Sequence, residues 1–214
     1  MKITKFGHSC LLIEESGVHL LTDPGSMNEV PAPAKLDAIL ITHEHQDHFD
    51  IDKIKALVAL HPGVVLITHP AVGAKLEEAG LAYTPIEPGA AVEVGGVTVE
   101  SYGTDHAIIY GDTPPCRNTG YLIANRLFMP GDALHDVPGK PVEILALPTG
   151  GPWMKMSEAV DYAKRVLPKV AFPIHDAMYS DDYRQRAVPR WMGNFLPPEV
   201  TFKNLLPGES VDLV

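Results

Sequence analysis

Three histidines and two aspartates fall within nine consecutive positions of the chain, 42–50, in the stretch THEHQDHFD. The chain has ten histidines among 214 residues, so this density is high even for a polar loop. Neutral imidazoles and carboxylates are ligands that zinc, manganese and iron accept in proteins. The stretch therefore indicates a metal site, and a polar surface loop is the alternative interpretation.

The spacing within this stretch suits two ions better than one. In a nearly extended backbone, side chains two positions apart point the same way, so His43 and His45 can reach a single ion. Asp47 and His48 are adjacent, so their side chains must diverge. We therefore expect Asp47 and His48 to serve a second ion on the other side of the loop.

One loop cannot complete two coordination spheres, so further ligands must come from elsewhere in the chain. Three candidates each follow an apolar or strand-like run: His106 in GTDHAII, Asp132 in FMPGDAL and His175 in VAFPIHDA. Each alone is typical of a surface loop. Together with the first stretch, they predict a shared site at the ends of several strands.

The elements that must position these residues are short strands with helices at intervals. Hydrophobic periodicity predicts strands over 2–6, 9–15, 17–23, 37–42, 64–68, 143–147 and 169–175. Helices are expected over 50–63, 70–80 and 156–168, the last capped by Ser157. Hairpins are expected over 90–103, turning at Gly95-Gly96, and over 119–132, turning at Asn125-Arg126. This mixture predicts a layered α/β protein with one domain spanning residues 1–214.

Composition limits the partners. The formal net charge of −10 argues against nucleic acid or an anionic membrane as a partner. A small-molecule substrate is the partner that we expect. No signal-peptide run and no span of about twenty apolar residues is present, so we expect a cytoplasmic protein. Cys10 and Cys116 lack metal-binding spacing and are expected to be reduced, the first in the core and the second on a loop. The oligomeric state is left open.

The order of these residues resembles that of the metallo-β-lactamase-fold hydrolases. The resemblance covers nearly the whole chain: the aspartate of LLTDPG, the Thr-His-x-His-x-Asp-His loop, a middle histidine, a Gly-Asp and a late histidine. It implies a four-layer αβ/βα sandwich with the site on one edge. It further implies the following roles: one metal held by His43, His45 and His106, the other by Asp47, His48 and His175, with Asp132 bridging and Asp23 supporting a ligand.

Two longer segments resemble one branch of that family. GHSCLLIEE with LLTDPG, and LPTGGPWMKMSEAV with PKVAFPIHD, are similar to the branch that includes the ascorbate-phosphate lactonase, N-acyl-phosphatidylethanolamine phospholipase D and many small uncharacterised bacterial hydrolases. The last group is the nearest match. The phospholipase's membrane-association features and the basic arm of the transfer-RNA-processing nucleases are not apparent in this sequence. Antibiotic hydrolysis is not favoured.

A centre of this kind implies hydrolysis. Two divalent ions contribute about +4, and two aspartates with a bridging hydroxide about −3, which leaves a centre near +1. Such a centre lowers the pKa of bound water toward about 7 and stabilises negative charge in the transition state. We therefore expect a dinuclear enzyme that uses a metal-bridging hydroxide to cleave a small, anionic ester, lactone or phosphodiester. Zinc is the expected metal, and manganese, nickel and iron are alternatives.

Several interpretations stay open. Asp47 is the ligand on which turnover should depend, and His135 either donates a proton to a leaving group or lies on a surface loop. His8 either reaches the site as a supporting residue or is structural, and Trp153 and Met154 line either the pocket or the core. The other histidines, His19, His61 and His69, are expected to be structural or exposed. The alternative function is a mononuclear-iron redox protein, or a non-catalytic metal-binding protein, on the same fold.

Overall fold

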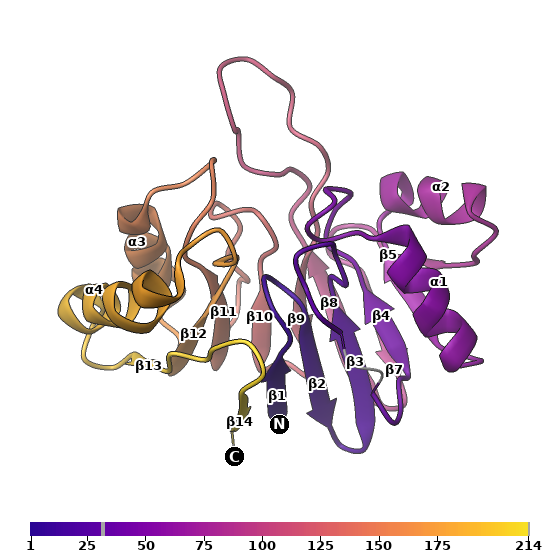
Figure 1. Cartoon of the computed structure of the whole chain (residues 1–214), viewed down its shortest axis with the longest axis horizontal. Helices are drawn as coiled ribbons and strands as arrows, with labels where there is room; N and C mark the ends of the chain where they lie inside the picture. Colours follow the sequence, from indigo (N-terminus) through magenta and orange to yellow (C-terminus); the bar gives the residue numbers. More distant parts are fainter. Residues whose placement is uncertain (31–32, 214) are drawn as a thin grey trace.

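The computed structural model describes residues 1–30 and 33–213, and within them the strands form two mixed sheets (Figure 1). The first sheet has the order β14-β1-β2-β3-β4-β5-β6. Its strands are β1 (Lys2–Lys5), β2 (Leu11–Glu15), β3 (Val18–Thr22), β4 (Ala38–Leu40), β5 (Val65–Thr68), β6 (Thr84–Pro85) and β14 (Ser210–Asp212).

The second sheet has the order β13-β12-β11-β10-β9-β8-β7. Its strands are β7 (Ala91–Val94), β8 (Val97–Tyr102), β9 (Gly120–Ile123), β10 (Leu127–Met129), β11 (Ile144–Pro148), β12 (Val170–Ile174) and β13 (Thr201–Phe202). The two sheets pack face to face around a shared apolar core. In that core Ile13 and Leu40 of the first sheet cluster with Tyr121 and Phe172 of the second.

Helices cover the outer face of each sheet. The first sheet is flanked by α1 (Ile51–Leu60) and α2 (Pro70–Glu78), and the second by α3 (Met156–Val166) and α4 (Val188–Phe195), which a short π-helical turn at Tyr183–Ala187 precedes (Figure 1). Separate apolar clusters fill these outer layers, with Leu57 and Leu76 against the first sheet and Ala163 and Met192 against the second. The expectation of a four-layer αβ/βα sandwich is confirmed.

Local details correct some of the expected boundaries. The first hairpin turns at Gly95-Gly96 as predicted, with φ of 56° and 87°. The second turns one residue earlier than predicted, because Ala124 and Asn125 adopt the left-handed conformation. Ser157 lies inside α3 and does not cap it.

The residue that precedes α3 is Lys155, whose backbone N–H donates to the Glu158 carboxylate at 2.6 Å. The Glu158 carboxylate therefore satisfies a backbone donor at the start of the helix. We had expected Ser157 to cap this end of the helix. The elements β6, α4, β13 and β14 were not anticipated from the sequence.

Strand direction determines where the functional loops meet. In the first sheet β1, β3 and β4 run the same way, because β1 and β3 both pair antiparallel with β2, while β3 and β4 are parallel. In the second sheet β8, β10 and β12 likewise share one direction. The loops that follow these strands therefore emerge together at one end of each sheet.

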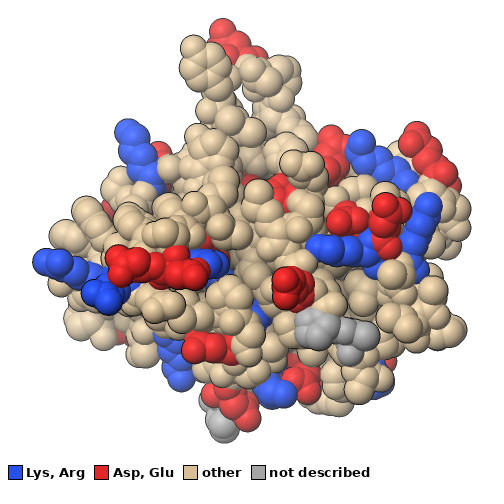
Figure 2. Space-filling view, viewed as in Figure 1, with Lys and Arg blue, Asp and Glu red and all other residues tan. Residues whose placement is uncertain are grey.

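The surface carries mixed charge. Figure 2 shows acidic and basic side chains interspersed over the viewed face, and the long loop between β8 and β9, which protrudes at the top, carries acidic atoms at its tip above mostly uncharged residues. Three large apolar side chains of that loop, Ile108, Ile109 and Tyr110, are exposed. Across the residues that the structure describes, each helix is too short or too polar to cross a membrane.

Candidate metal centre

The predicted ligands all lie on loops at this common end of the strands. His8 follows β1, Asp23 follows β3, and the THEHQDH loop begins two residues after β4 ends. The remaining three follow β8, β10 and β12. Rigid, buried strands thus fix the starting point of each loop, which is how residues as far apart in the sequence as His8 and His175 come into contact.

One cluster contains three histidines and one aspartate. Ligand atoms of His43, His45, His106 and Asp132 all lie within 4.8 Å of one another. His43 Nε2 is 3.1 Å from His45 Nδ1, and His106 Nε2 is 3.3 Å from Asp132 Oδ2. The set matches the ligands predicted for the first ion together with the predicted bridging residue.

A second cluster contains His8, Asp47, His48 and His175, whose ligand atoms also lie within 4.8 Å of one another. Asp47 Oδ2 is 3.2 Å from His8 Nε2, 3.8 Å from His48 Nε2 and 3.7 Å from His175 Nε2. Three of these residues are those predicted for the second ion. His8 joins them from the loop after β1.

Asp132 lies between the two clusters. Its Oδ2 is 2.7 Å from His175 Nε2 and 3.9 Å from His43 Nε2, and its Oδ1 is 3.2 Å from His48 Nε2. The carboxylate therefore contacts histidines of both sets. This position is the one that a bridging ligand requires.

Hydrogen bonds on the outer side of the rings orient three histidines. His48 Nδ1 lies 2.7 Å from Asp23 Oδ2, while Nδ1 of His106 and of His175 face the carbonyl oxygens of Ala107 and Gly150. Because these partners accept hydrogen bonds, each Nδ1 carries the proton. Each Nε2 then faces the centre, where a bound metal ion would take the place of any proton on that nitrogen.

Buried atoms at the centre lack hydrogen-bond partners, which tests whether the residues fit metal ions. Nε2 of His48, His106 and His175 and Oδ1 of Asp132 are all buried without a hydrogen bond. An unpaired buried polar atom is costly, and divalent ions would satisfy all four. The donor set of imidazoles and carboxylates fits zinc, manganese or iron.

The electrostatics hold Asp132 ionised and His43 neutral, whereas His48 differs. Burial lowers the pKa of His48, but the carboxylates of Asp132 and Asp23 outweigh burial and raise it above its usual value. Burial alone raises the pKa of the Asp132 carboxyl, but His48 and His175 outweigh burial and hold it well below its usual range. Burial lowers the pKa of His43, with a further contribution from His48, so its ring is neutral. An ionised aspartate beside a neutral imidazole is the pairing that binds a divalent cation.

The supporting aspartate acts on two neighbours. Asp23 Oδ1 accepts the Thr42 backbone N–H, and Asp23 Oδ2 accepts both the Thr42 hydroxyl and His48 Nδ1–H, at 2.7–2.8 Å. Asp23 is fully buried. It therefore fixes the start of the THEHQDH loop as well as the ring of His48.

His8 occupies a supporting position of a different kind. Its Nδ1 accepts the backbone N–H of Ala177 at 3.2 Å, so the ring proton resides on Nε2, which faces Asp47. Burial lowers the pKa of His8 to about 4, so the ring is neutral. In this tautomer His8 presents a donor to the Asp47 carboxylate and no lone pair to an ion. This favours the supporting role over that of a ligand.

The remaining predicted residues lie outside both clusters. His135 is half exposed, and its Nε2 is 3.3 Å from Asp136 Oδ2 and is not among the ligand-type atoms gathered at the centre. His19, His61 and His69 also lie elsewhere, with His69 buried beside α2. Cys10 is buried in the core as expected.

Three contacts at the centre were not predicted from the sequence, although Trp153 does line the cleft over the clusters, one of the two positions considered for it. Trp153 donates its indole N–H to Asp132 Oδ2 at 3.0 Å, and Cys116 Sγ lies 3.6 Å from His45 Nε2. Gly25 packs directly on the backbone of Asp47, where a Cβ would lie 2.0 Å from the carbonyl carbon. The only sequence signal for the tryptophan was its place beside the Gly150-Gly151 pair.

Two sheets packed between helix layers, with histidines and aspartates gathered at the ends of the strands, define a metal-binding α/β sandwich. A family model described as a beta-lactamase superfamily domain matches residues 2–175. The chain therefore belongs to the beta-lactamase superfamily, as the order of its ligand-type residues suggested.

Curated relatives match over most of their length. A Mycobacterium tuberculosis protein is 41% identical over 190 residues, which cover 86% of this chain and 88% of the relative. A Carboxydothermus hydrogenoformans protein named as a metal-dependent hydrolase is 30% identical over 198 residues, which cover 82% of this chain and 84% of the relative. The expected enzyme class agrees with the name of this second relative.

Solved structures share the fold at low identity. Igni18, a metallo hydrolase from Ignicoccus hospitalis, aligns with a TM-score of 0.73 and 20% identity, covering 98% of this chain and 97% of its own. CmlA, a diiron β-hydroxylase from Streptomyces venezuelae, aligns with a TM-score of 0.67 and 14% identity, covering 99% of this chain and 54% of its own. These two likenesses establish the fold.

Proposed function

We propose that this chain is a dinuclear metal-dependent hydrolase that cleaves a small ester, lactone or phosphodiester. The observation that carries the proposal is the pair of ligand clusters joined by Asp132. We assign His43, His45 and His106 to one ion, Asp47, His48 and His175 to the other, and Asp132 to both. Ions held in this way would acidify a water molecule and polarise the oxygen of the scissile group.

The chain's own residues shape where the reaction would occur. A cleft of about 500 Å³ opens over the clusters, and Ile109, Trp153 and Met178 contribute to its walls. This volume suits a small-molecule substrate. The indole of Trp153 donates to Asp132 and thereby fixes both that carboxylate and one wall of the cleft.

The charge of the centre favours a substrate whose scissile group is anionic or becomes so. Two carboxylates, Asp47 and Asp132, face two divalent ions, so positive charge remains after the ligands are counted. That charge would stabilise the oxyanion or the pentacoordinate phosphorus of the transition state. Zinc is the proposed metal, and manganese, nickel and iron are the alternatives.

Metal content tests the number and kind of ions. Protein purified without added metal or a histidine tag, then analysed by elemental mass spectrometry, is expected to hold two equivalents of zinc or manganese per chain. One equivalent of iron would instead support the redox function. No metal, even after reconstitution at neutral pH, would contradict the site.

A single substitution tests the mechanism. Asp47→Ala should lose most turnover on a panel of lactones and phosphodiesters. It should also bind fewer than two equivalents of metal per chain, while its circular dichroism spectrum stays unchanged. Asp52→Ala, which removes an exposed carboxylate from the first turn of α1, serves as the matched control. Unchanged turnover in Asp47→Ala would contradict a dinuclear mechanism.

A further inference from the structure

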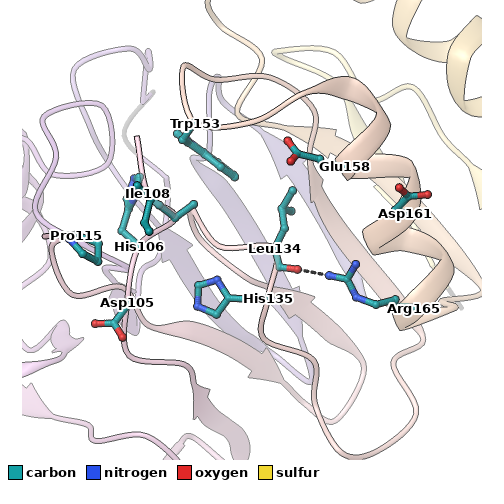
Figure 3. Close-up of a pocket in the computed structure, with 11 residues that line it drawn as sticks. Asp105, His106, Ile108, Pro115, Leu134, His135, Trp153, Glu158, Asp161 and Arg165 are labelled. Carbon is teal, nitrogen blue, oxygen red and sulfur yellow. Dashed lines mark hydrogen bonds between the residues drawn. The ribbon is translucent and has the colours of Figure 1, made fainter. Parts of the chain in front are cut away.

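A second cavity adjoins the cleft over the metal ligands. It has a volume of about 600 Å³ and lies between the loop after His106 and helix α3, with Leu134 and His135 between them (Figure 3). His106 and Trp153 line both this cavity and the cleft. A molecule whose reacting group sits over the metal ligands can therefore extend into the second cavity without leaving the protein surface.

The loop between β8 and β9 separates the two spaces. Ile108 lines the second cavity, and the next residue, Ile109, lines the cleft. These side chains are 60% and 48% exposed, which is unusual for neighbouring isoleucines in a folded protein. Contiguous exposed apolar surface beside a cavity is typical of a ligand-binding surface. A bound group with apolar surface would cover these side chains.

The charge lining the second cavity is predominantly negative. Carboxylates of Asp105, Glu158 and Asp161 line it, and they outnumber the guanidinium of Arg165, one N–H of which donates to the carbonyl oxygen of Leu134 (Figure 3). A negatively charged group placed there would face three carboxylates against one guanidinium, so the net charge around it is negative. The lining of the cavity thus carries net negative charge, whereas the proposed metal centre beside it would carry net positive charge.

We propose that this cavity is the subsite for the leaving group, and that it takes an aromatic or branched aliphatic group that carries no negative charge and binds best with a basic nitrogen. The apolar wall of Ile108, Pro115 and Leu134, with the indole of Trp153, packs on the body of the group. The carboxylate of Asp161 selects its charge. This assignment rests on the proposed hydrolase function, and it places His135 beside the leaving group and away from the ligand clusters.

The indole N–H of Trp153 provides a direct reporter. The chain has two tryptophans, and Trp191 lies half exposed on α4, so Trp191→Phe leaves a single indole resonance. We would titrate the ¹⁵N-labelled, metal-loaded variant with three phenols that differ in one substituent. The probes are 3-(hydroxymethyl)phenol, 3-(aminomethyl)phenol and 3-hydroxybenzoate, and the readout is the Kd from the shift of the indole resonance.

The amine is expected to bind about two- to fivefold more tightly than the alcohol, because one partly exposed ion pair changes Kd by about that factor. The carboxylate is expected to bind most weakly of the three. Asp161→Asn, added to Trp191→Phe, should remove the advantage of the amine. Glu78→Gln, which neutralises an exposed carboxylate on α2, should leave the order unchanged. Ile108→Ala should weaken all three probes alike.

Two results of the titration, and one result of turnover, would overturn the subsite. Either the carboxylate binds as tightly as the amine in the Trp191→Phe protein, or no probe shifts the indole resonance up to its solubility limit. The titration requires no turnover, so these results differ from a failure of the hydrolase proposal, which metal content and Asp47→Ala decide. If the enzyme turns over but shows no preference among leaving groups, only the subsite is refuted.

Discussion

A buried ion pair ties the N-terminal strand to the loop that carries His175. Lys5 Nζ lies 2.8 Å from both carboxylate oxygens of Asp176 and 2.8 Å from the carbonyl oxygen of Pro173. The side chains are 0% and 1% exposed. Burial lowers the pKa of Lys5, and Asp176 opposes that effect. Replacing Lys5 with methionine would leave the aspartate without its cation in the interior.

We expect Lys5→Met to lower the free energy of unfolding by about 3–5 kcal/mol, the cost of an uncompensated buried charge. Methionine has a similar volume, so a cavity adds little to this figure. The double variant Lys5→Met/Asp176→Asn removes both charges and should recover most of the loss. The difference in unfolding free energy between the two variants separates the effect of the unpaired buried charge from the effect of the changed packing.

Urea unfolding at neutral pH, with and without metal, provides the measurement. Asp176 directly follows His175, and the His175 backbone N–H donates to the carbonyl oxygen of His8, so a displaced Asp176 should also weaken metal binding. Lys5→Met should therefore lose both stability and metal affinity. A loss of less than about 1 kcal/mol, or a double variant as unstable as Lys5→Met, would refute the reasoning.

Three further predictions concern other contacts. Gly25→Ala should destabilise the fold and release metal, because its Cβ would lie 2.0 Å from the Asp47 carbonyl; unchanged urea unfolding would contradict this. Asp23→Ala should weaken metal binding about 10–100-fold by freeing the ring of His48, measured by competition with a chelator; unchanged affinity would argue against a supporting role. Burial lowers the pKa of His69 to about 4, so its contribution to stability is complete above about pH 6.5 and is lost as pH falls toward 4. His69→Gln should remove up to about 3 kcal/mol of that dependence in urea unfolding, and an unchanged pH profile would contradict it.

The elements that carry the site were largely predictable because their signals are local. A buried strand such as β4 appears as a continuous apolar run, and the Gly95-Gly96 turn needs backbone angles that glycine adopts without strain. The two C-terminal strands were missed because β13 and β14 are only two and three residues long. Such short strands exist through pairing with distant partners, which leaves no periodic pattern in the sequence.

The sequence by itself determined which residue types could bind metal and in what order they occur. His43, His45, Asp47 and His48 are adjacent in the chain, so spacing alone predicted that they share a site. Only the tertiary structure decided that Asp132 lies between the two clusters and that Trp153 donates to it.

The same limit applies to the tautomer of His8, the close approach at Gly25 and the Lys5–Asp176 pair. Each of these depends on two segments from different parts of the chain being held at contact distance by the packed sheets. A sequence records local preferences, whereas the distance between remote residues is fixed by how the strands pair and pack.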